Sequence, residues 1–422
     1  MGDGTLHGRQ AGRGGARRGV AGLRHVLVIG SDRMEPVELL LSDPEVRVSA
    51  MCKPKYAHLY EGKADVWTVD DVADLAQARA AMLRILERHP VDAIVTPIER
   101  AVLTGGFLRS FYGVPGLTFE QCLRCTNKYL MKRCFSGAGL PVTGFLRLDR
   151  LDDLPRAADL LGWPVVLKPT MGSGTMHVRV IEDEAEFERL RASGGFDAIL
   201  GLGVPLLLER YVDMEAEYHC DSAVFGGEVR FAAVGRYHWP PLKQQGWGGS
   251  ALCDPEDDPA VPGVLELNRR ALKALGLEAA VTHLEVFKTA GGLLVGEVAV
   301  RPGGGGIQDA LRLKYGDDLQ EAFVRAAQGL EPRLRLAPIK DAVGALGLPS
   351  KNGRVRYITP AEELERLPGV ARAKLYHGPG DLIQEKLTSV FFSGVCVLRA
   401  NDHAGLRRAV EAVQAAFRLE VG

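Results

Sequence analysis

The chain has 422 residues, of which 46% are hydrophobic and 25% are charged, and its formal net charge is −1. This length is sufficient for two to four domains with cores of their own. The near balance of charge argues against binding to nucleic acid or to membranes through a general basic surface. No run of eighteen apolar residues occurs, so no membrane-spanning segment is expected.

The N-terminal segment and the cysteines give only general expectations. Residues 1–23 are rich in glycine and arginine and lack the apolar segment of a secretory signal, which predicts a disordered tail. An RNA-binding or targeting role for this tail is the alternative. Seven cysteines without framework spacing predict reduced thiols and a cytoplasmic location. The lone C-x-x-C pair, Cys122 and Cys125, is not expected to hold a metal or a redox centre.

Residues 24–125 are predicted to form an N-terminal domain around an open α/β sheet. The expected strands cover residues 25–30, 46–52, 64–69 and 91–97, and an amphipathic helix covers 74–89. The first strand is followed by Gly30, Ser31, Asp32 and Arg33 rather than by G-x-G-x-x-G. The sequence therefore lacks a dinucleotide fingerprint.

A second domain is predicted over residues 126–334 and a small antiparallel unit over 335–422. The expected elements of the second domain are a helix in 126–145 capped by Thr126 or Asn127, strands at 163–169 and 177–181, a strand pair formed by 204–212 and 217–226, and a hairpin at 281–300 turned at 289–292. The last unit is expected to hold strands at 353–358, 371–383 and 389–400 and a helix at 403–420.

The hairpin at 281–300 carries two acids that are expected to meet. A strand period of two places Glu297 and Arg301 on one face, and Glu285 lies opposite Glu297 or within one residue of it. Two carboxylates ~4 Å apart repel by about 4 kcal/mol at an effective dielectric of roughly 20, so a cation between them is favoured. Mg²⁺ is the natural candidate. A solvated hairpin face, with Arg301 neutralising one acid, is an equally good interpretation of the hairpin alone.

A lysine followed by a loop of small residues forms a second candidate site. Lys168 ends an apolar strand, and Gly172, Ser173, Gly174 and Thr175 follow. Such loops present backbone N–H groups to phosphate oxygens, and the lysine adds positive charge. The order differs from that of the Walker motif. An ordinary β-hairpin with a solvated lysine is the alternative.

Three further features are weak by themselves. Glu209 closes an apolar strand, and the backbone of Tyr211 and Val212 after it could face a planar ring. Glu217 could accept hydrogen bonds from ribose hydroxyls. Lys128 lies just inside the helix that begins near Asn127.

Taken in order, these motifs resemble the ATP-grasp superfamily, and within it the carboxylate–amine ligases similar to the L-amino-acid (dipeptide) ligases. The resemblance runs from about residue 25 to the end of the chain. It implies an α/β (α+β) ATP-grasp fold with an N-terminal pre-ATP-grasp domain, a two-lobed ATP-grasp domain with a nucleotide-binding lid at about 140–210, and a C-terminal α+β unit similar to that of biotin carboxylases.

The resemblance also implies a role for each motif residue. ATP would be held by Lys128 and Lys168 at the α- and β-phosphates, by Gly172, Ser173, Gly174 and Thr175 over the β- and γ-phosphates, by Glu209, Tyr211 and Val212 at adenine, and by Glu217 at ribose. Mg²⁺, with Mn²⁺ as an expected substitute, would be held by Glu285 and Glu297. Arg301 would steady the acyl phosphate, with Gly303, Gly304 and Gly305 near a substrate carboxylate.

The sequence departs from the family pattern in places. Ala299 occupies a position where many members have an asparagine metal ligand, and Met171 and Met176 flank the glycine loop. The segment 235–250 lies where family members line the acceptor pocket. Its members that could contact an amino acid are His238, Trp239, Lys243 and Trp247, and a packed surface loop is the alternative.

The implied reaction joins a small-molecule carboxylate to an amine. The carboxylate attacks the γ-phosphate of ATP, ADP leaves, and the amine displaces phosphate from the acyl phosphate. Phosphoryl transfer depends on positioning and charge neutralisation, which agrees with two lysines, an arginine and paired acids without an evident nucleophile. Amino-acid substrates and a homodimer are expected from the resemblance, and no nucleic-acid or membrane partner.

Three other interpretations share some of these motifs. A ligase or transferase of the purine-biosynthetic type carries most of them. A biotin-carboxylase-like enzyme is less favoured, because its longer glycine-rich loop is missing here. A regulatory module that binds ATP without catalysis would not require Arg301 beside Lys168, Glu285 and Glu297.

Overall fold

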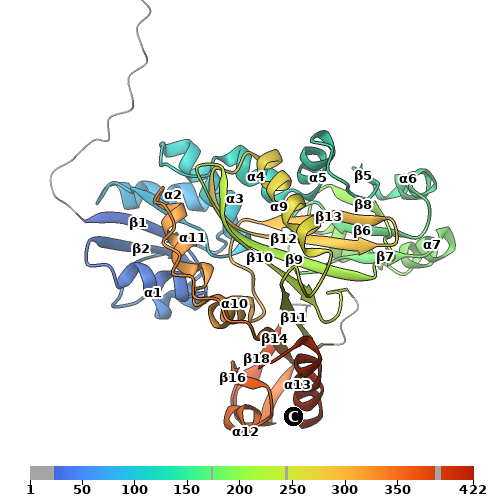
Figure 1. Cartoon of the computed structure of the whole chain (residues 1–422). Helices are drawn as coiled ribbons and strands as arrows, with labels where there is room; N and C mark the ends of the chain where they lie inside the picture. Colours follow the sequence, from blue (N-terminus) through green and yellow to red (C-terminus); the bar gives the residue numbers. More distant parts are fainter. Residues whose placement is uncertain (1–22, 173, 243–245, 385–390) are drawn as a thin grey trace, which may run out of the picture.

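The computed structural model describes residues 23–172, 174–242, 246–384 and 391–422. The predicted tail, apart from Leu23, therefore lies outside the described residues, as do Ser173 and Lys243. Figure 1 shows the chain as a blue N-terminal part, a green and yellow central part and a red C-terminal part.

A four-stranded parallel sheet forms the N-terminal part, in the order β3-β2-β1-β4. Its strands are β1 (Arg24–Ile29), β2 (Val46–Cys52), β3 (Asp65–Thr68) and β4 (Ala93–Val95). Its helical segments are α1 (Glu35–Leu41), η1 (Pro54–Leu59), α2 (Leu75–Leu86), α3 (Glu99–Tyr112) and α4 (Phe119–Thr126). Side chains of β1 alternate between two cores, with Val26 and Val28 on the side of α1 and Leu27 and Ile29 on the side of α2. The predicted open α/β sheet is confirmed.

A four-stranded antiparallel sheet forms the region predicted as the lid, in the order β5-β8-β6-β7. Its elements are β5 (Phe145–Leu148), η2 (Leu151–Asp153), α6 (Leu154–Leu161), β6 (Val165–Pro169), β7 (Arg179–Ile181), α7 (Glu184–Ala192), α8 (Asp197–Leu200) and β8 (Leu206–Arg210). Phe187 of α7 and Ala158 of α6 are buried against Leu208 of β8 and Leu167 of β6. The sheet thus has one face covered by helices.

The prediction that 204–212 pairs with 217–226 is wrong. β8 lies between β5 and β6, whereas the next strand, β9 (Ala216–Phe225), belongs to another sheet. The segment between them crosses from one sheet to the other and brings Tyr211 and Val212 to the cavity described below. β8 and β9 follow each other in sequence but do not pair, because other strands occupy both edges of each.

An eight-stranded sheet is the largest element, in the order β13-β12-β9-β10-β11-β14-β18-β16. The strands other than β9 are β10 (Glu228–Tyr237), β11 (Gly248–Cys253), β12 (Ala279–Thr289), β13 (Gly292–Ala299), β14 (Ala342–Pro349), β16 (Val370–Leu375) and β18 (Phe392–Ala400). One face packs on α5 (Lys128–Gly137) and α9 (Val261–Leu275), and the other on α10 (Ile307–Tyr315) and α11 (Leu319–Ala327). Figure 1 shows α11 reaching across to β1 and β2, so α11 serves both sheets.

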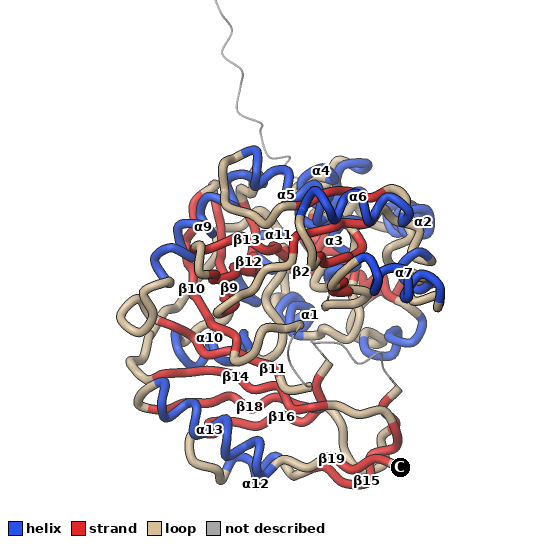
Figure 2. Tube along the Cα trace, turned by 90° about the vertical axis from the view of Figure 1, so that its right-hand side faces the viewer, coloured by secondary structure: helices blue, strands red, loops and turns tan. Residues whose placement is uncertain are grey.

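The large sheet contains strands from both sides of the predicted boundary near residue 335. β11 pairs with β14, so the C-terminal strands extend the central sheet instead of forming a separate one. Figure 2 shows β14, β18 and β16 running together in the lower part of the molecule. A smaller sheet, α12 (Ala361–Glu365) and α13 (His403–Ala416) complete this end; its strands are β17 (Leu382–Ile383), β15 (Gly353–Ile358) and β19 (Leu419–Val421).

The last predicted helix is shorter than expected. α13 ends at Ala416, and the following residues form β19, which pairs with β15. Phe417 has an extended backbone and is buried in the C-terminal core. Among the described residues, no helix is both long and apolar enough to cross a membrane.

Candidate active site

A cavity of about 940 Å³ lies between the lid sheet, the β12–β13 hairpin and the N-terminal sheet. It brings together segments far apart in the chain. The predicted site residues that line it are Lys128, Lys168, Gly172, Gly174, Thr175, Glu209, Tyr211, Val212, Glu217, Glu285, Glu297, Arg301, Gly304 and Gly305.

The β12–β13 hairpin places its two acids as its spacing predicts. Leu284 pairs with Val298 and Val286 with Val295, and the bulge between these pairs sets Glu285 within one residue of Glu297. Burial and the neighbouring Glu297 carboxylate raise the pKa of Glu285. A divalent ion bound by both carboxylates would relieve the repulsion between them.

Five charged side chains form a connected series of ion pairs at the cavity wall, in which lysines and glutamates alternate. Lys132 Nζ lies 2.7 Å from Glu209 Oε1, and Lys168 Nζ lies 2.6 Å from Glu209 Oε2. Lys168 Nζ also lies 2.6 Å from Glu297 Oε1, whose other oxygen is 2.6 Å from Lys128 Nζ. Each of the three lysines contacts a carboxylate, and the two carboxylates are shared among the three lysines.

These ion pairs determine the charge states of the wall. Burial opposes ionisation of Glu209 and Glu297, but the lysines outweigh it and hold the pKa of each carboxyl below its usual range. Glu209 and Glu297 likewise outweigh the burial of Lys168 and raise its pKa. Among the described residues, no lysine forms an ion pair with Glu217, and burial together with Glu285 and Glu297 raises its pKa well above the usual range. Glu217 therefore lies beside the acidic pair as well as in the cavity wall.

Lys132 is a site residue that sequence reasoning missed. Its side chain is 1% exposed and contacts Glu209 from α5. Helix α5 begins after Asn127, whose side chain accepts a hydrogen bond from the backbone N–H of Leu130. Lys128 and Lys132 are four residues apart and so share one helix face. The four-residue spacing could therefore have indicated Lys132 from the sequence.

Arg301 is held in place at the end of the hairpin. Its Nε donates to Glu99 Oε2 at 3.1 Å, and its Nη1 donates to the Pro302 carbonyl at 3.0 Å. Glu99 is the first residue of α3, and no motif pointed to it. The N-terminal part thus positions a side chain of the hairpin.

Glycine at position 303 is explained by close packing beneath the cavity. A Cβ atom there would lie 2.6 Å from Asp221 Oδ1 and 2.8 Å from His283 Nδ1, too close for any side chain. Within the described residues, Gly303 is absent from the cavity wall, while Gly304 and Gly305 line it. Proximity of Gly303 to a substrate remains a prediction.

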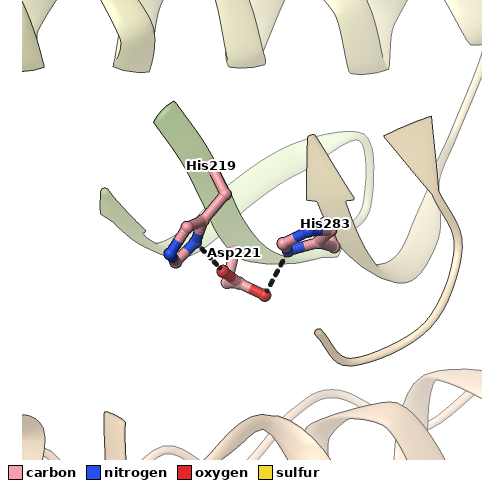
Figure 3. A group of neighbouring side chains, drawn as sticks. All are labelled: His219, Asp221 and His283. Carbon is pink, nitrogen blue, oxygen red and sulfur yellow. Dashed lines mark hydrogen bonds and ion pairs between the residues drawn. The ribbon is translucent and has the colours of Figure 1, made fainter. Parts of the chain in front are cut away.

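A buried network of His219, Asp221 and His283 supports the sheet behind the hairpin (Figure 3). The Asp221 carboxylate lies 2.6 Å from His219 Nδ1 and 3.0 Å from His283 Nδ1. The remaining ring nitrogens contact Ser250 Oγ at 2.8 Å and Tyr237 Oη at 3.1 Å. The three residues are close enough to hold a metal ion, but all four ring nitrogens already have hydrogen-bond partners. Hydrogen bonding alone accounts for the cluster.

The structure does not bring His238 and Trp247 to the cavity. His238 Nε2 contacts the Ala345 carbonyl at 3.2 Å, and the Trp247 ring packs 5.9 Å from that of Phe417. Trp239 packs on the same C-terminal core. Pairing of β11 with β14 draws the segment toward that core, so the packed-loop alternative describes these residues.

Comparison with known proteins gives consistent matches. The model of the L-amino acid ligase C-terminal domain 2 matches residues 346–422. An L-arginine-specific L-amino acid ligase of Bacillus subtilis is 36% identical over 373 residues, which cover 87% of this chain and 90% of that protein. Dapdiamide A synthase of Enterobacter agglomerans is 24% identical, with 79% and 81% covered.

Solved structures match over nearly the whole chain. An L-amino acid ligase from Bacillus licheniformis has a TM-score of 0.76 at 18% identity, with 94% of this chain and 99% of that chain covered. N5-carboxyaminoimidazole ribonucleotide synthetase from Thermotoga maritima has a TM-score of 0.68 at 16% identity, with 95% and 100% covered. These likenesses establish the fold.

The fold and the charged cavity define an ATP-grasp enzyme, as expected from the order of the motifs. Within this class, the chain belongs to the L-amino acid ligases. It is an ATP-dependent, ADP-forming ligase that joins amino-acid substrates through an amide bond.

Proposed function

We propose that this cavity binds ATP and Mg²⁺ and forms the acyl phosphate of one amino acid beside the amine of another. The observation that carries the proposal is the ion-pair chain through Glu209, Lys168 and Glu297, which places two cations next to the acidic hairpin. ATP would exchange the lysine–carboxylate contacts for lysine–phosphate contacts. Solved structures of ATP-grasp neighbours with bound ADP, one of them as MgADP, support a nucleotide in this position.

The donor set of the hairpin fits Mg²⁺. Glu285 and Glu297 supply carboxylate oxygens, the ligands that Mg²⁺ prefers, and phosphate oxygens and water would complete its shell. Ala299 supplies no side-chain oxygen at the third position. When bound, the ion would neutralise the phosphate charge that builds up during transfer. We expect Mn²⁺ to substitute, because it shares this ligand preference.

The residues of the chain have distinct parts in the two steps. Lys128 and Lys168 would hold the phosphates while the substrate carboxylate attacks the γ-phosphate. Arg301, fixed by Glu99, would steady the acyl phosphate and the tetrahedral species formed by the amine. The loop around Gly172 would cover the phosphates, and the left-handed backbone of Thr175, at φ 56°, shows that this loop is held in an unusual conformation.

A phosphate-release screen over amino acids, singly and in pairs, tests the proposal. We expect ADP and phosphate to appear in equal amounts and to require both an acid and an amine. Binding of a non-hydrolysable ATP analogue, measured by calorimetry with and without Mg²⁺, should weaken in Lys168→Met. Unchanged nucleotide affinity in Lys168→Met would overturn the assignment of this cavity.

We further propose a cytoplasmic homodimer. All seven cysteines are free, which favours a reducing compartment. A biotin carboxylase domain among the structural neighbours was solved as a dimer. Light scattering of the purified protein tests the oligomeric state, and a monomer would contradict it.

A further inference from the structure

An arginine from the N-terminal part enters the cavity without a carboxylate partner. Arg33 follows β1 and lines the cavity. A Cβ atom built on Gly304 would lie 3.4 Å from Arg33 Nη2, so the guanidinium lies against the glycine-rich segment. Among the described residues, no carboxylate oxygen lies within the 4.0 Å of an ion pair with Arg33. Its sequence neighbour Asp32 instead accepts a hydrogen bond from Ser31 Oγ.

A second guanidinium group, that of Arg301, lines the same cavity and is near enough for its charge to act on Arg33. Arg301 uses Nε for Glu99 and Nη1 for the Pro302 carbonyl, and neither contact involves Nη2. Desolvation by the cavity wall and the positive charge of Arg301 lower the pKa of Arg33, although Glu35 and Asp32 act in the opposite sense. Among the described residues, Glu99 forms an ion pair with Arg301, whereas Arg33 has no ion pair. Arg33 is exposed to solvent, so an anion that enters the cavity can reach its guanidinium group.

We propose that Arg33, together with Arg301, binds the free α-carboxylate of the amine substrate over Gly304. A guanidinium group matches a carboxylate with two parallel hydrogen bonds, and a pair of them around one carboxylate gives both affinity and orientation. Glycine at 304 leaves space beside the Arg33 guanidinium group, because a Cβ atom there would lie 3.4 Å from Arg33 Nη2.

The order of residues along the cavity selects this carboxylate. Glu297 lies on β13, Arg301 follows the end of that strand, and Gly304, which contacts Arg33, comes three residues later in the chain. The carboxylate of the acid substrate reacts at the phosphate end and is consumed. The amine substrate alone keeps a free α-carboxylate after the bond forms, on the side away from the phosphates. The inference rests on the proposed function in taking Glu285 and Glu297 as the phosphate end.

The test compares Arg33→Met with the wild type on two amine substrates, an amino acid and its primary amide. The amide lacks the negative charge but keeps the amine. We expect KM for the amino acid to rise about 10- to 100-fold, which corresponds to the loss of a charge-assisted hydrogen bond. KM for the amide, for ATP and for the acid substrate should stay the same. Arg33→Lys should restore part of the preference, and Arg79→Met, on the exposed face of α2, serves as the matched control.

Hydroxylamine separates this inference from the proposed function. It attacks the acyl phosphate directly and gives a hydroxamate and phosphate, so it reports the first step without an amino-acid amine. Arg33→Met should form hydroxamate at the wild-type rate. Absence of hydroxamate in the wild type would overturn the proposed function itself. Loss of hydroxamate in Arg33→Met alone, or an equal loss for the amino acid and its amide, would overturn the role of Arg33.

Discussion

The two ends of the cavity hold similar side chains in opposite states of pairing. At the acidic hairpin, Lys128 and Lys168 are already paired with carboxylates. At the Gly304 end, Arg33 has no such partner in the described part of the chain. A ligand at the first end must exchange existing ion pairs, so its net gain is the difference between two sets of contacts. A ligand at the second end adds new contacts.

The two ends are suited to different parts of substrate binding. Internal pairing keeps the buried lysines and glutamates charged and in place, which suits a site that must position phosphates before any reaction. The Arg33 guanidinium group is exposed to solvent, so an anion can bind it without displacing an existing ion pair. Nucleotide binding would then depend on preorganisation, and selection of the second substrate on direct attraction.

The largest expected effect comes from breaking the paired end with Glu297→Ala. This change removes a carboxylate of the proposed metal site and leaves Lys128 without its partner. ADP formation should fall by roughly 10³-fold or more, since the ion is expected to supply several kcal/mol of charge stabilisation. A coupled ADP assay measures it, with far-UV circular dichroism to check the fold. Glu278→Ala, at an exposed position before β12, is the control, and wild-type turnover in Glu297→Ala would remove the metal assignment.

Lys132→Met tests whether the paired end is also an internal support. Lys132 is buried and lines no part of the cavity, so its removal leaves Glu209 with one lysine instead of two. We expect the free energy of unfolding to drop by about 3 kcal/mol in urea, with a rise in KM for ATP. Lys273→Met, on the exposed face of α9, should change stability little. Equal stabilities of the two variants would contradict a supporting role.

Arg301→Ala probes the junction of the two ends. Arg301 comes between the acidic hairpin and Gly304 in the chain, and its guanidinium group is expected to contact charge that develops in the transition state. Product formation should decrease about 10²-fold, the usual cost of losing such a contact. Arg301→Lys is the matched variant, because it keeps the positive charge. Its single-turnover rate would show how much of the loss comes from the geometry of the guanidinium group. An unchanged rate in Arg301→Ala would make Arg301 a structural residue.

The smallest expected effect concerns His238, a histidine that burial keeps neutral. Burial lowers the pKa of His238 to about 4, against a usual value of 6.5. Below pH 6.5 the unfolded chain binds a proton that the folded chain does not, so stability decreases as the pH falls toward 4. Relative to His238→Gln, the wild type should lose about 2 kcal/mol of unfolding free energy between pH 7.5 and pH 4.5. Parallel stability curves for the two proteins would contradict this pKa.

The amino-acid sequence by itself determined the local features. Short apolar runs predicted β1 to β4, a cap at Thr126 or Asn127 predicted the start of α5, and the turn at 289–292 predicted the register of the hairpin. Each of these features depends on residues within a few positions of one another. Each motif can be recognised from its own residues, and the order of the motifs along the chain was sufficient to indicate the enzyme class.

Tertiary structure decided the contacts that link distant segments. Lys128 and Glu297 are 169 residues apart, and Arg301 and Glu99 are 202 apart, and no local pattern predicts which of many charges will meet. Lys132 and Glu99 were missed because each pairs with a residue of another element. The two tryptophans of 235–250 were candidates for the acceptor pocket, with a packed loop as the alternative, and both pack against the C-terminal core. Local periodicity fixes the elements, and their packing selects which side chains share a cavity.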